Sequence, residues 1–190
     1  MGTNTAVATP APTKVVTGVV RFSYMHVWEP ASINPGDDPK YSVSLLIPKS
    51  DKATIASIKE AIKIATEAGK STKFEGKIPG NLKTPLRDGD IDRPDDENYA
   101  GHYFVNANCK TKPGIVDKNS KPIMEQDEVY SGCYGRASVT FYAYNAKGTK
   151  GIACGLNHIM KTKDGEPLGG RSTAESDFAG VETNDEEDFG

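Results

Sequence analysis

The sequence contains few residues of the kinds that build metal centres and catalytic sites. It has three cysteines and three histidines among 190 residues. Cys109, Cys133 and Cys154 lie more than 20 residues apart, and no Cys-x-x-Cys or His-x-x-x-His spacing occurs. We therefore predict no zinc or other metal site, and we interpret the cysteines as small buried side chains in a reducing compartment.

Long hydrophobic runs are absent as well. No stretch approaches the about 18 consecutive apolar residues of a membrane span, and the Thr/Ala/Pro-rich residues 1–13 lack the apolar segment of a signal peptide. We expect a flexible N-terminus and a soluble cytosolic protein without a membrane partner. No Gly-rich phosphate loop and no Ser-His-Asp or Cys-His arrangement occurs, so we expect neither an enzyme nor a bound cofactor.

One acidic segment raises the alternative of a nuclease. Residues 86–97 contain six acids, as a two-metal nuclease would need, but Arg87 and Arg93 lie among them. Catalytic carboxylates usually converge from rigid elements, whereas a turn-rich run with two arginines favours a self-paired surface loop. A nuclease would reveal itself by cleaving DNA when magnesium is added.

The charges divide the chain into a basic body and an acidic tail. The chain has 23 basic and 26 acidic residues, and residues 172–190 hold seven of the acids and no Lys or Arg. Residues 1–171 therefore have 23 basic against 19 acidic residues, a net charge of +4, beside a tail of −7. This division is expected where the body binds a polyanion and the tail competes for the same surface, so it points to nucleic acid.

Two phenylalanines lie among the acids of the tail. An acidic segment that only increases solubility does not require aromatic residues, whereas a short linear motif docks such residues in a basic and hydrophobic pocket of a partner protein. We predict that residues 166–190 are a disordered tail. Its predicted partner-binding residues are Phe178, Asp185, Glu186, Glu187, Asp188 and Phe189.

Hydrophobic periodicity predicts five strands and one helix. The strands are expected at residues 15–28, with a bend at Gly18, and at 41–47, 102–110, 134–145 and 151–162. A helix with a cap at Ser50 or Asp51 should end near Gly69, and residues 146–149 should form a hairpin turn. Residues 70–101 form a longer segment than an ordinary connection between elements. We expect this segment, which we call the excursion, to be ordered. The set favours an all-β OB fold over a small sandwich: a five-stranded Greek-key barrel over residues 14–165 with a long loop insertion.

The alternation also predicts which side chains face outward. Tyr24 falls in the inward set of the first strand, whereas Phe104 falls in the outward set of the third strand. Aromatic rings interleaved with cations suit single-stranded nucleic acid, because bases stack on the rings while Lys and Arg neutralise phosphates. The predicted DNA-binding residues are Arg21, Trp28, Phe104, Lys110, Lys112, Arg136, Tyr142 and Tyr144. Each aromatic also has a structural reading as a strand former, and Trp28 as a loop anchor.

Several motifs occur in one order along the chain. They are Leu86-Arg-Asp-Gly-Asp, Tyr99-Ala-Gly-His-Tyr-Phe-Val-Asn-Ala, Pro113-Gly-Ile-Val-Asp, Tyr130-Ser-Gly-Cys, Phe141-Tyr-Ala-Tyr, Lys150-Gly-Ile-Ala-Cys-Gly-Leu and Asp164-Gly-Glu-Pro-Leu-Gly-Gly. From Val15 onward the chain resembles the single-stranded DNA-binding proteins of tailed bacteriophages, of the Enterobacter-phage type. In related podophage proteins the tail ends on an aromatic residue, whereas Gly190 follows Phe189 here.

The resemblance implies an OB-fold body that coats single-stranded DNA without sequence preference during phage replication, recombination or repair. It also implies an acidic tail that contacts replication proteins, such as DNA polymerase or helicase, in the host cell cytoplasm. A virion or scaffolding-type structural protein is the alternative. The sequence leaves open whether the chain forms a homo-oligomer.

Overall fold

The computed structural model describes residues 12–32, 34–168 and 178. The strands are β1 (Lys14–Val16), β2 (Val20–Ala31), β3 (Lys40–Pro48), β4 (Arg87–Asp88), β5 (His102–Cys109), β6 (Gly114–Val116), β7 (Tyr134–Ala146) and β8 (Thr149–Lys163). The helices are α1 (Lys52–Thr72), the short α2 (Gly89–Asp92) and a 3-10 turn (Gln126–Glu128). Among these residues no helix is long and apolar enough to cross a membrane.

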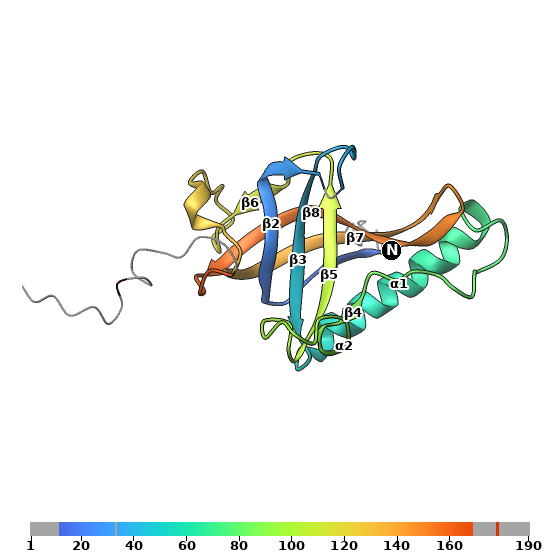
Figure 1. Cartoon of the computed structure of the whole chain (residues 1–190), viewed down its shortest axis with the longest axis horizontal. Helices are drawn as coiled ribbons and strands as arrows, with labels where there is room; N and C mark the ends of the chain where they lie inside the picture. Colours follow the sequence, from blue (N-terminus) through green and yellow to red (C-terminus); the bar gives the residue numbers. More distant parts are fainter. Residues whose placement is uncertain (1–11, 33, 169–177, 179–190) are drawn as a thin grey trace, which may run out of the picture.

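Five of the strands close into a barrel. Their order around the barrel is β7-β2-β3-β5-β8, and β8 pairs again with β7. Only the β5–β8 contact is parallel among these pairings. When the five barrel strands are numbered along the chain from β2, neighbours around the barrel follow the order 1-2-3-5-4 and then 1 again. This is the Greek-key arrangement of an OB fold. The predicted fold class is confirmed, and Figure 1 shows β2, β3 and β5 across the front.

The first barrel strand is interrupted at Gly18, as predicted. β1 precedes the break and pairs with β7, and β2 follows it. Thr17, fully buried at the break, accepts a hydrogen bond from the Ala137 N–H through Oγ1 at 3.0 Å. A Cβ at position 18 would lie 2.5 Å from a carboxylate oxygen of Asp51, so glycine lets the chain pass close to the start of α1.

Helix α1 packs its apolar stripe onto the barrel beside β7. Asp51 caps the helix by accepting the Thr54 N–H at 3.2 Å, as the sequence predicted. The buried positions repeat with helical spacing at Ile55, Ile58, Ala61 and Ala65. The predicted end at Gly69 was wrong, because the helix continues to Thr72. Gly69 instead allows close packing, since a Cβ there would clash with the side chain of Ala143 on β7.

The hairpin of β7 and β8 extends beyond the barrel and lies beside α1 (Figure 1). Its turn residues Lys147 and Gly148 both have positive φ, 52° and 88°. This is the two-residue turn whose twist matches paired strands, and it confirms the predicted hairpin. Lys83 adds an isolated bridge to Gly151, so the excursion after α1 runs along the edge of β8.

The described ends of the chain are paired with the barrel. Thr13, predicted to be flexible, accepts the Phe141 N–H through its carbonyl at 2.9 Å. Residues 166–168, predicted to be disordered, fold back against the residues before β7, where the Leu168 N–H donates to the Ser131 carbonyl at 2.9 Å. The rest of the predicted N-terminal segment and tail lies outside the described residues, apart from the exposed Phe178.

Candidate nucleic-acid interface

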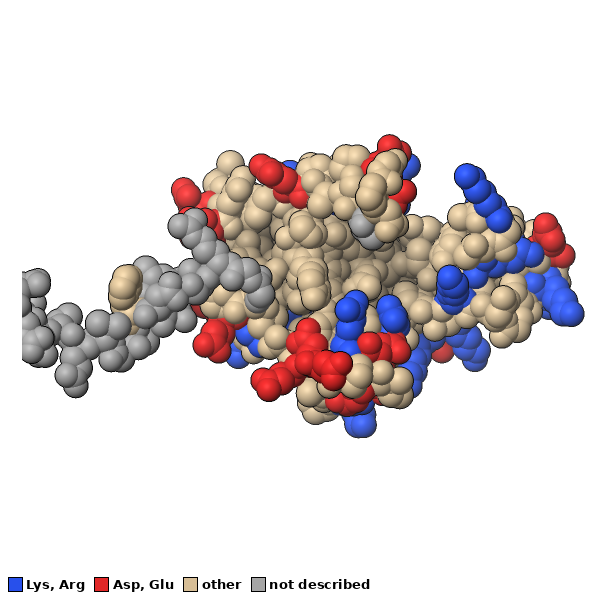
Figure 2. All heavy atoms as spheres, in the orientation of Figure 1, with Lys and Arg blue, Asp and Glu red and all other residues tan. Residues whose placement is uncertain are grey.

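A polar hollow of about 440 Å³ lies on the outer surface of β2, β3 and β5. In Figure 2 this front of the barrel shows mostly uncharged side chains, and charged groups gather around it. The hollow is lined by Tyr24, His26, Ala31, Ser32, Ser42, Val43, Ser44, Arg93, Tyr99, Asn106, Ala107 and Asn108. It spans the first three barrel strands and so includes the second and third, the surface on which OB folds commonly hold oligonucleotides.

Tyr24 projects into this hollow because of a bulge in β2. Its backbone has φ of 47°, a conformation that non-glycine residues seldom adopt. The pairing of β2 with β3 shifts between Ser23 and His26, so Tyr24 turns outward with 57% of its surface exposed. The predicted inward position of Tyr24 was therefore wrong. Strict alternation places it inside, and the extra residue of the bulge reverses the phase.

The lower wall of the hollow comes from the excursion between α1 and β5. Tyr99 is 1% exposed, and its hydroxyl donates to the Ser44 Oγ at 3.3 Å. The guanidinium of Arg93 lies 5.7 Å from the centroid of the Tyr99 ring and remains exposed. An exposed arginine held over a ring can offer both a planar stacking surface and phosphate-binding donors.

A second hollow of about 330 Å³ continues the first one. Tyr24 and His26 line both hollows, and the second ends at Ser131 and Leu168. We call the two together the groove. Its residues come from three barrel strands, the excursion and the segment after β8, so a bound chain would cross the strands.

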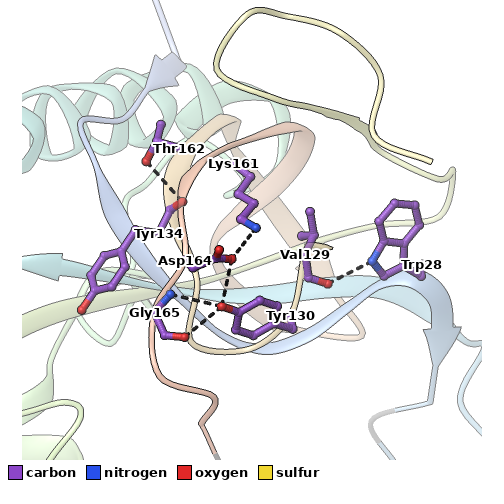
Figure 3. A network of polar contacts seen from close by, with 8 residues as sticks. All are labelled: Trp28, Val129, Tyr130, Tyr134, Lys161, Thr162, Asp164 and Gly165. Atoms are coloured by element: carbon purple, nitrogen blue, oxygen red, sulfur yellow. Dashed lines mark hydrogen bonds and ion pairs between the residues drawn. The ribbon is translucent and has the colours of Figure 1, made fainter. Parts of the chain in front are cut away.

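The segment that closes the groove is held by several polar contacts (Figure 3). The Tyr130 hydroxyl donates to Asp164 at 3.1 Å and accepts the Gly165 N–H at 3.2 Å. Lys161 pairs with Asp164 at 2.5 Å, which holds the pKa of that carboxyl below its usual value. Arg21 donates to the Glu166 carbonyl at 2.7 Å. Residue 168 therefore has a fixed place at the end of the groove.

Phe104, predicted to be an exposed stacking residue, is fully buried. It does point away from the barrel core, as the alternation required. However, β4 pairs with β5 at this position, and Tyr99 covers the ring. With Leu46 the two rings form a second hydrophobic cluster, against which Leu168 packs. The prediction failed because the excursion folds over this part of β5.

Arg21 is also tied into the structure. Its guanidinium donates to the Gly132 carbonyl at 3.1 Å as well as to Glu166, and it lies 5.4 Å from the centre of the Tyr134 ring. Through these contacts, Arg21 links β2 to the segment after β8. Its predicted contact with DNA stays untested.

Trp28, Lys110 and Lys112 lie where β2 and β5 end. The Lys112 ammonium is 5.1 Å from the Trp28 ring centre, and the indole N–H donates to the Val129 carbonyl at 3.0 Å (Figure 3). Lys110 is exposed and lines a small hollow with Lys40 and two aspartates. These three predicted residues are grouped near the loop that follows β2, and their role stays a prediction.

Arg136, Tyr142 and Tyr144 lie on the outer face of β7, a different wall of the barrel. Arg136 and Tyr142 are exposed, the latter by 46%, and Tyr144 is half-buried against Gly151. The predicted phase of this strand is confirmed. The structure does not join these residues to the groove, so the chain has two separate candidate surfaces.

The sequence reasoning missed Tyr24, His26, Arg93, Asn106 and Asn108. Asn106 and Asn108 were placed correctly outward but passed over, because they are neither aromatic nor basic. Arg93 was assigned to a self-paired loop. Nothing in the residues around Tyr24 announces the bulge, since the αL conformation is usually marked by Gly or Asn.

The prediction of a self-paired acidic loop is confirmed in part, because Arg87 pairs with an acid of the same segment, whereas Asp88 and Asp90 pair with Lys49, which follows β3. Lys49 contacts Asp88 at 2.8 Å and Asp90 at 2.6 Å, and Arg87 pairs with Asp92 at 2.9 Å. Hydrogen bonds from Lys49 lower the pKa of both Asp88 and Asp90. Across the described residues, no group of three or more His, Cys, Asp or Glu side chains has the geometry to hold a metal ion.

An OB-fold barrel with an aromatic and polar groove across its first three strands is typical of oligonucleotide-binding proteins. The family described as Enterobacter phage Enc34, ssDNA-binding protein, matches residues 13–190. The chain belongs to this family, which confirms the resemblance found in the sequence.

Several known proteins and solved structures are similar to this chain. Putative protein p50 of Acyrthosiphon pisum secondary endosymbiont phage 1 is 32% identical over 183 residues, which cover 93% of this chain and 98% of that protein. The single-stranded DNA-binding protein from bacteriophage Enc34 in complex with ssDNA has a TM-score of 0.73 at 28% identity, over 83% of this chain and 90% of that one. Gp2.5, a single-stranded DNA-binding protein of bacteriophage T7, shares the fold, with a TM-score of 0.59 at 17% identity over 90% and 96% of the two chains.

Proposed function

We propose that this protein coats single-stranded DNA without sequence preference during phage DNA replication, recombination or repair in the host cytoplasm, and that the strand lies in the groove. The observation that carries the location is Tyr24. A strained bulge in β2, the first barrel strand, turns this ring, 57% exposed, outward into the hollow that it shares with the second and third strands. Strained conformations concentrate at functional sites, where the surrounding structure maintains them.

The groove suits unpaired bases of any sequence. Tyr24 and the Arg93 guanidinium offer flat surfaces, and every base has a π-face that can stack on them. Asn106 and Asn108 add amide donors and acceptors. In a duplex the base faces are covered by their neighbours in the stack, so the stacking contribution belongs to single strands alone.

Trp28, Lys110 and Lys112 extend this proposal to the end of the groove next to the loop after β2. There the lysines would neutralise phosphates and the indole ring would support Lys112. Arg136, Tyr142 and Tyr144 represent a competing surface on β7. A substitution in each surface distinguishes them, as described in the Discussion.

The acidic tail supplies the regulatory part of the proposal. Leu168 is fixed at the end of the groove, and the −7 segment starts four residues further along the chain, so it would be able to reach the proposed DNA site. A flexible segment of 19 residues spans about 22–26 Å, and tethering gives it an effective concentration on the order of millimolar. The tail would compete with weakly bound phosphates, and Phe178 and Phe189 would contact replication proteins such as DNA polymerase or helicase once DNA displaces it.

A titration with oligo-dT and with a matched duplex, repeated at several salt concentrations, tests the proposed function. We expect tight binding to oligo-dT and weak binding to duplex. The log-log salt slope should be about −0.7 for each single-strand phosphate neutralised. Preference for duplex would refute the proposal. Assembly in the absence of DNA, together with no salt-dependent affinity for oligonucleotides, would favour a virion or scaffolding-type structural protein.

A further inference from the structure

The groove is short of positive charge for a site that binds a polyanion. Its lining residues include one arginine, Arg93, and no lysine. Asp96 adds an acid to the same lining. Stacking can hold the bases, but phosphates that stay close together need cations, and these must come from a neighbouring surface.

Helix α1 carries such a surface. Lys52, Lys59, Lys63 and Lys70 are spaced by seven, four and seven residues. At 3.6 residues per turn these four positions lie within about 20° of one line along the helix, over about 27 Å. All four are exposed, and among the described residues none of them forms an ion pair. We call these four residues the lysine stripe.

The second lysine of the stripe lies beside β5, a strand of the groove. The Lys59 ammonium lies 5.8 Å from the Tyr103 ring on β5. Tyr103 is three residues from Asn106 of the groove, about 10 Å along the strand, and its side chain lies on the opposite face of β5. A strand that leaves the groove would therefore pass around the end of β5 to reach Lys59. From there α1 runs toward the tip of the β7–β8 hairpin, and Lys and Arg side chains gather over this end of the molecule (Figures 1 and 2).

We propose that the lysine stripe is a second DNA contact surface, which binds the phosphate backbone of the single strand after it leaves the groove past β5. The inference rests on the proposed function and adds the path of the strand. The contact is mainly electrostatic, because Ala56, Thr66 and Glu67, which lie between the stripe lysines, offer no ring for a base to stack on. Glu67 lowers the net positive charge of the stripe to +3. The stripe thus lengthens the bound strand without adding base contacts.

The acidic tail of another copy is the competing occupant. Such a tail carries Phe178 and Phe189 among its acids, and a motif of this kind docks its rings in an apolar pocket. Apolar side chains do lie near the stripe, with Tyr103 beside Lys59 and the exposed Val16 in a hollow that Ala56 also lines. That hollow also contains the acid Glu60, which would repel an acidic tail, so the line of cations fits a chain of phosphates better.

The test compares two double variants that remove the same charge. Lys63→Gln with Lys70→Gln alters the stripe, and Lys118→Gln with Lys121→Gln is the control, in an exposed loop after β6. None of these four lysines forms an ion pair or a cation–π contact among the described residues. Gln has nearly the helix propensity of Lys, so α1 should fold equally well.

Affinities are measured for an oligo-dT of about 5 nucleotides, which the groove alone would cover, and for one of about 30 nucleotides. The stripe variant should bind the long strand several-fold more weakly at low salt, with a salt slope smaller by about 1.4 for two lost contacts. It should bind the short strand as the wild type does. The control variant should bind both the short and the long strand with the wild-type affinity, within the experimental error of the wild-type measurements.

Other outcomes separate the two proposals. If the wild type binds oligo-dT and the stripe variant behaves like the control, the lysine stripe is not a DNA surface. If the loss disappears when residues 172–190 are deleted from both proteins, the stripe binds the tail instead. A wild type that binds no oligo-dT refutes the proposed function itself.

Discussion

The ring of Tyr99 meets the ring of Phe104 edge to face, with centroids 5.0 Å apart and planes at 89°. This contact lies outside the barrel, where Leu46 and Leu168 pack against the same pair. It joins the excursion, β3, β5 and the segment after β8 directly beside the groove. The groove wall therefore depends on a small hydrophobic cluster of its own.

Replacement of Phe104 by alanine should destabilise the fold. The loss of a fully buried ring and the resulting cavity typically cost about 3–5 kcal/mol of unfolding free energy. Denaturant unfolding measures the effect, and Tyr142→Ala serves as the exposed control with little expected change. A Phe104→Ala protein of wild-type stability with reduced DNA affinity would restore the stacking role predicted from the sequence.

Replacement of Tyr24 by alanine should lower the affinity for oligo-dT by roughly 1–3 kcal/mol and leave stability nearly unchanged, as expected for an exposed base-stacking residue. Tyr24→Gly should also weaken binding, yet gain stability of order 1 kcal/mol, because glycine adopts a φ of 47° without strain. Fluorescence titration and thermal unfolding measure both effects. If Tyr142→Ala loses affinity and Tyr24→Ala does not, the outer face of β7 is the DNA site.

Replacement of Arg21 by alanine should reduce stability rather than DNA affinity. The side chain donates to the carbonyls of Gly132 and Glu166, and hydrogen bonds from a charged donor contribute roughly 1.5–3 kcal/mol. Thermal unfolding and an oligo-dT titration on the same sample separate the two effects. A large loss of affinity at full stability would support the sequence prediction that Arg21 contacts DNA.

Deletion of residues 172–190 should strengthen DNA binding at low salt. The duplex affinity should rise by the larger factor, because duplex lacks the stacking contribution that already displaces the tail from single strands. The gain should shrink at high salt, where the charges are screened. Unchanged affinity at low salt would exclude competition by the tail, and retained binding to replication proteins would exclude the partner role of Phe178 and Phe189.

Replacement of Lys49 by glutamine should destabilise the protein near neutral pH but not in acid. Lys49 lowers the pKa of Asp88 and Asp90 below the usual value of 3.8. Carboxyls with a lowered folded-state pKa contribute stability above that value and lose it as the pH falls through the folded pKa. Thermal unfolding of both proteins between pH 7 and pH 2.5 should show a difference that closes below about pH 3.8. A constant difference would mean that Lys49 acts through packing alone.

The sequence by itself determined the elements whose signals are local. The alternation of β7 placed Arg136 and Tyr142 outward, the 3.6-residue period of α1 placed Ile55 and Ile58 inward, and Lys147-Gly148 specified the turn. Burial of an apolar face, capping and turn geometry each involve residues close together in the chain. The motif order then led to the family, whereas the acidic tail predicted from the charge division lies outside the described residues apart from Phe178.

Only the tertiary structure decided which outward side chains remain accessible. Phe104 is covered by residues of the excursion, a segment without a strong local pattern, and Tyr24 is exposed by a single-residue shift of pairing between two strands. The groove also needs Arg93, an excursion residue, to lie beside Asn106 of β5. Such contacts depend on how a loop crosses a sheet and on where a strand bulges. These are properties of paired and packed elements, which the periodicity of one segment does not encode.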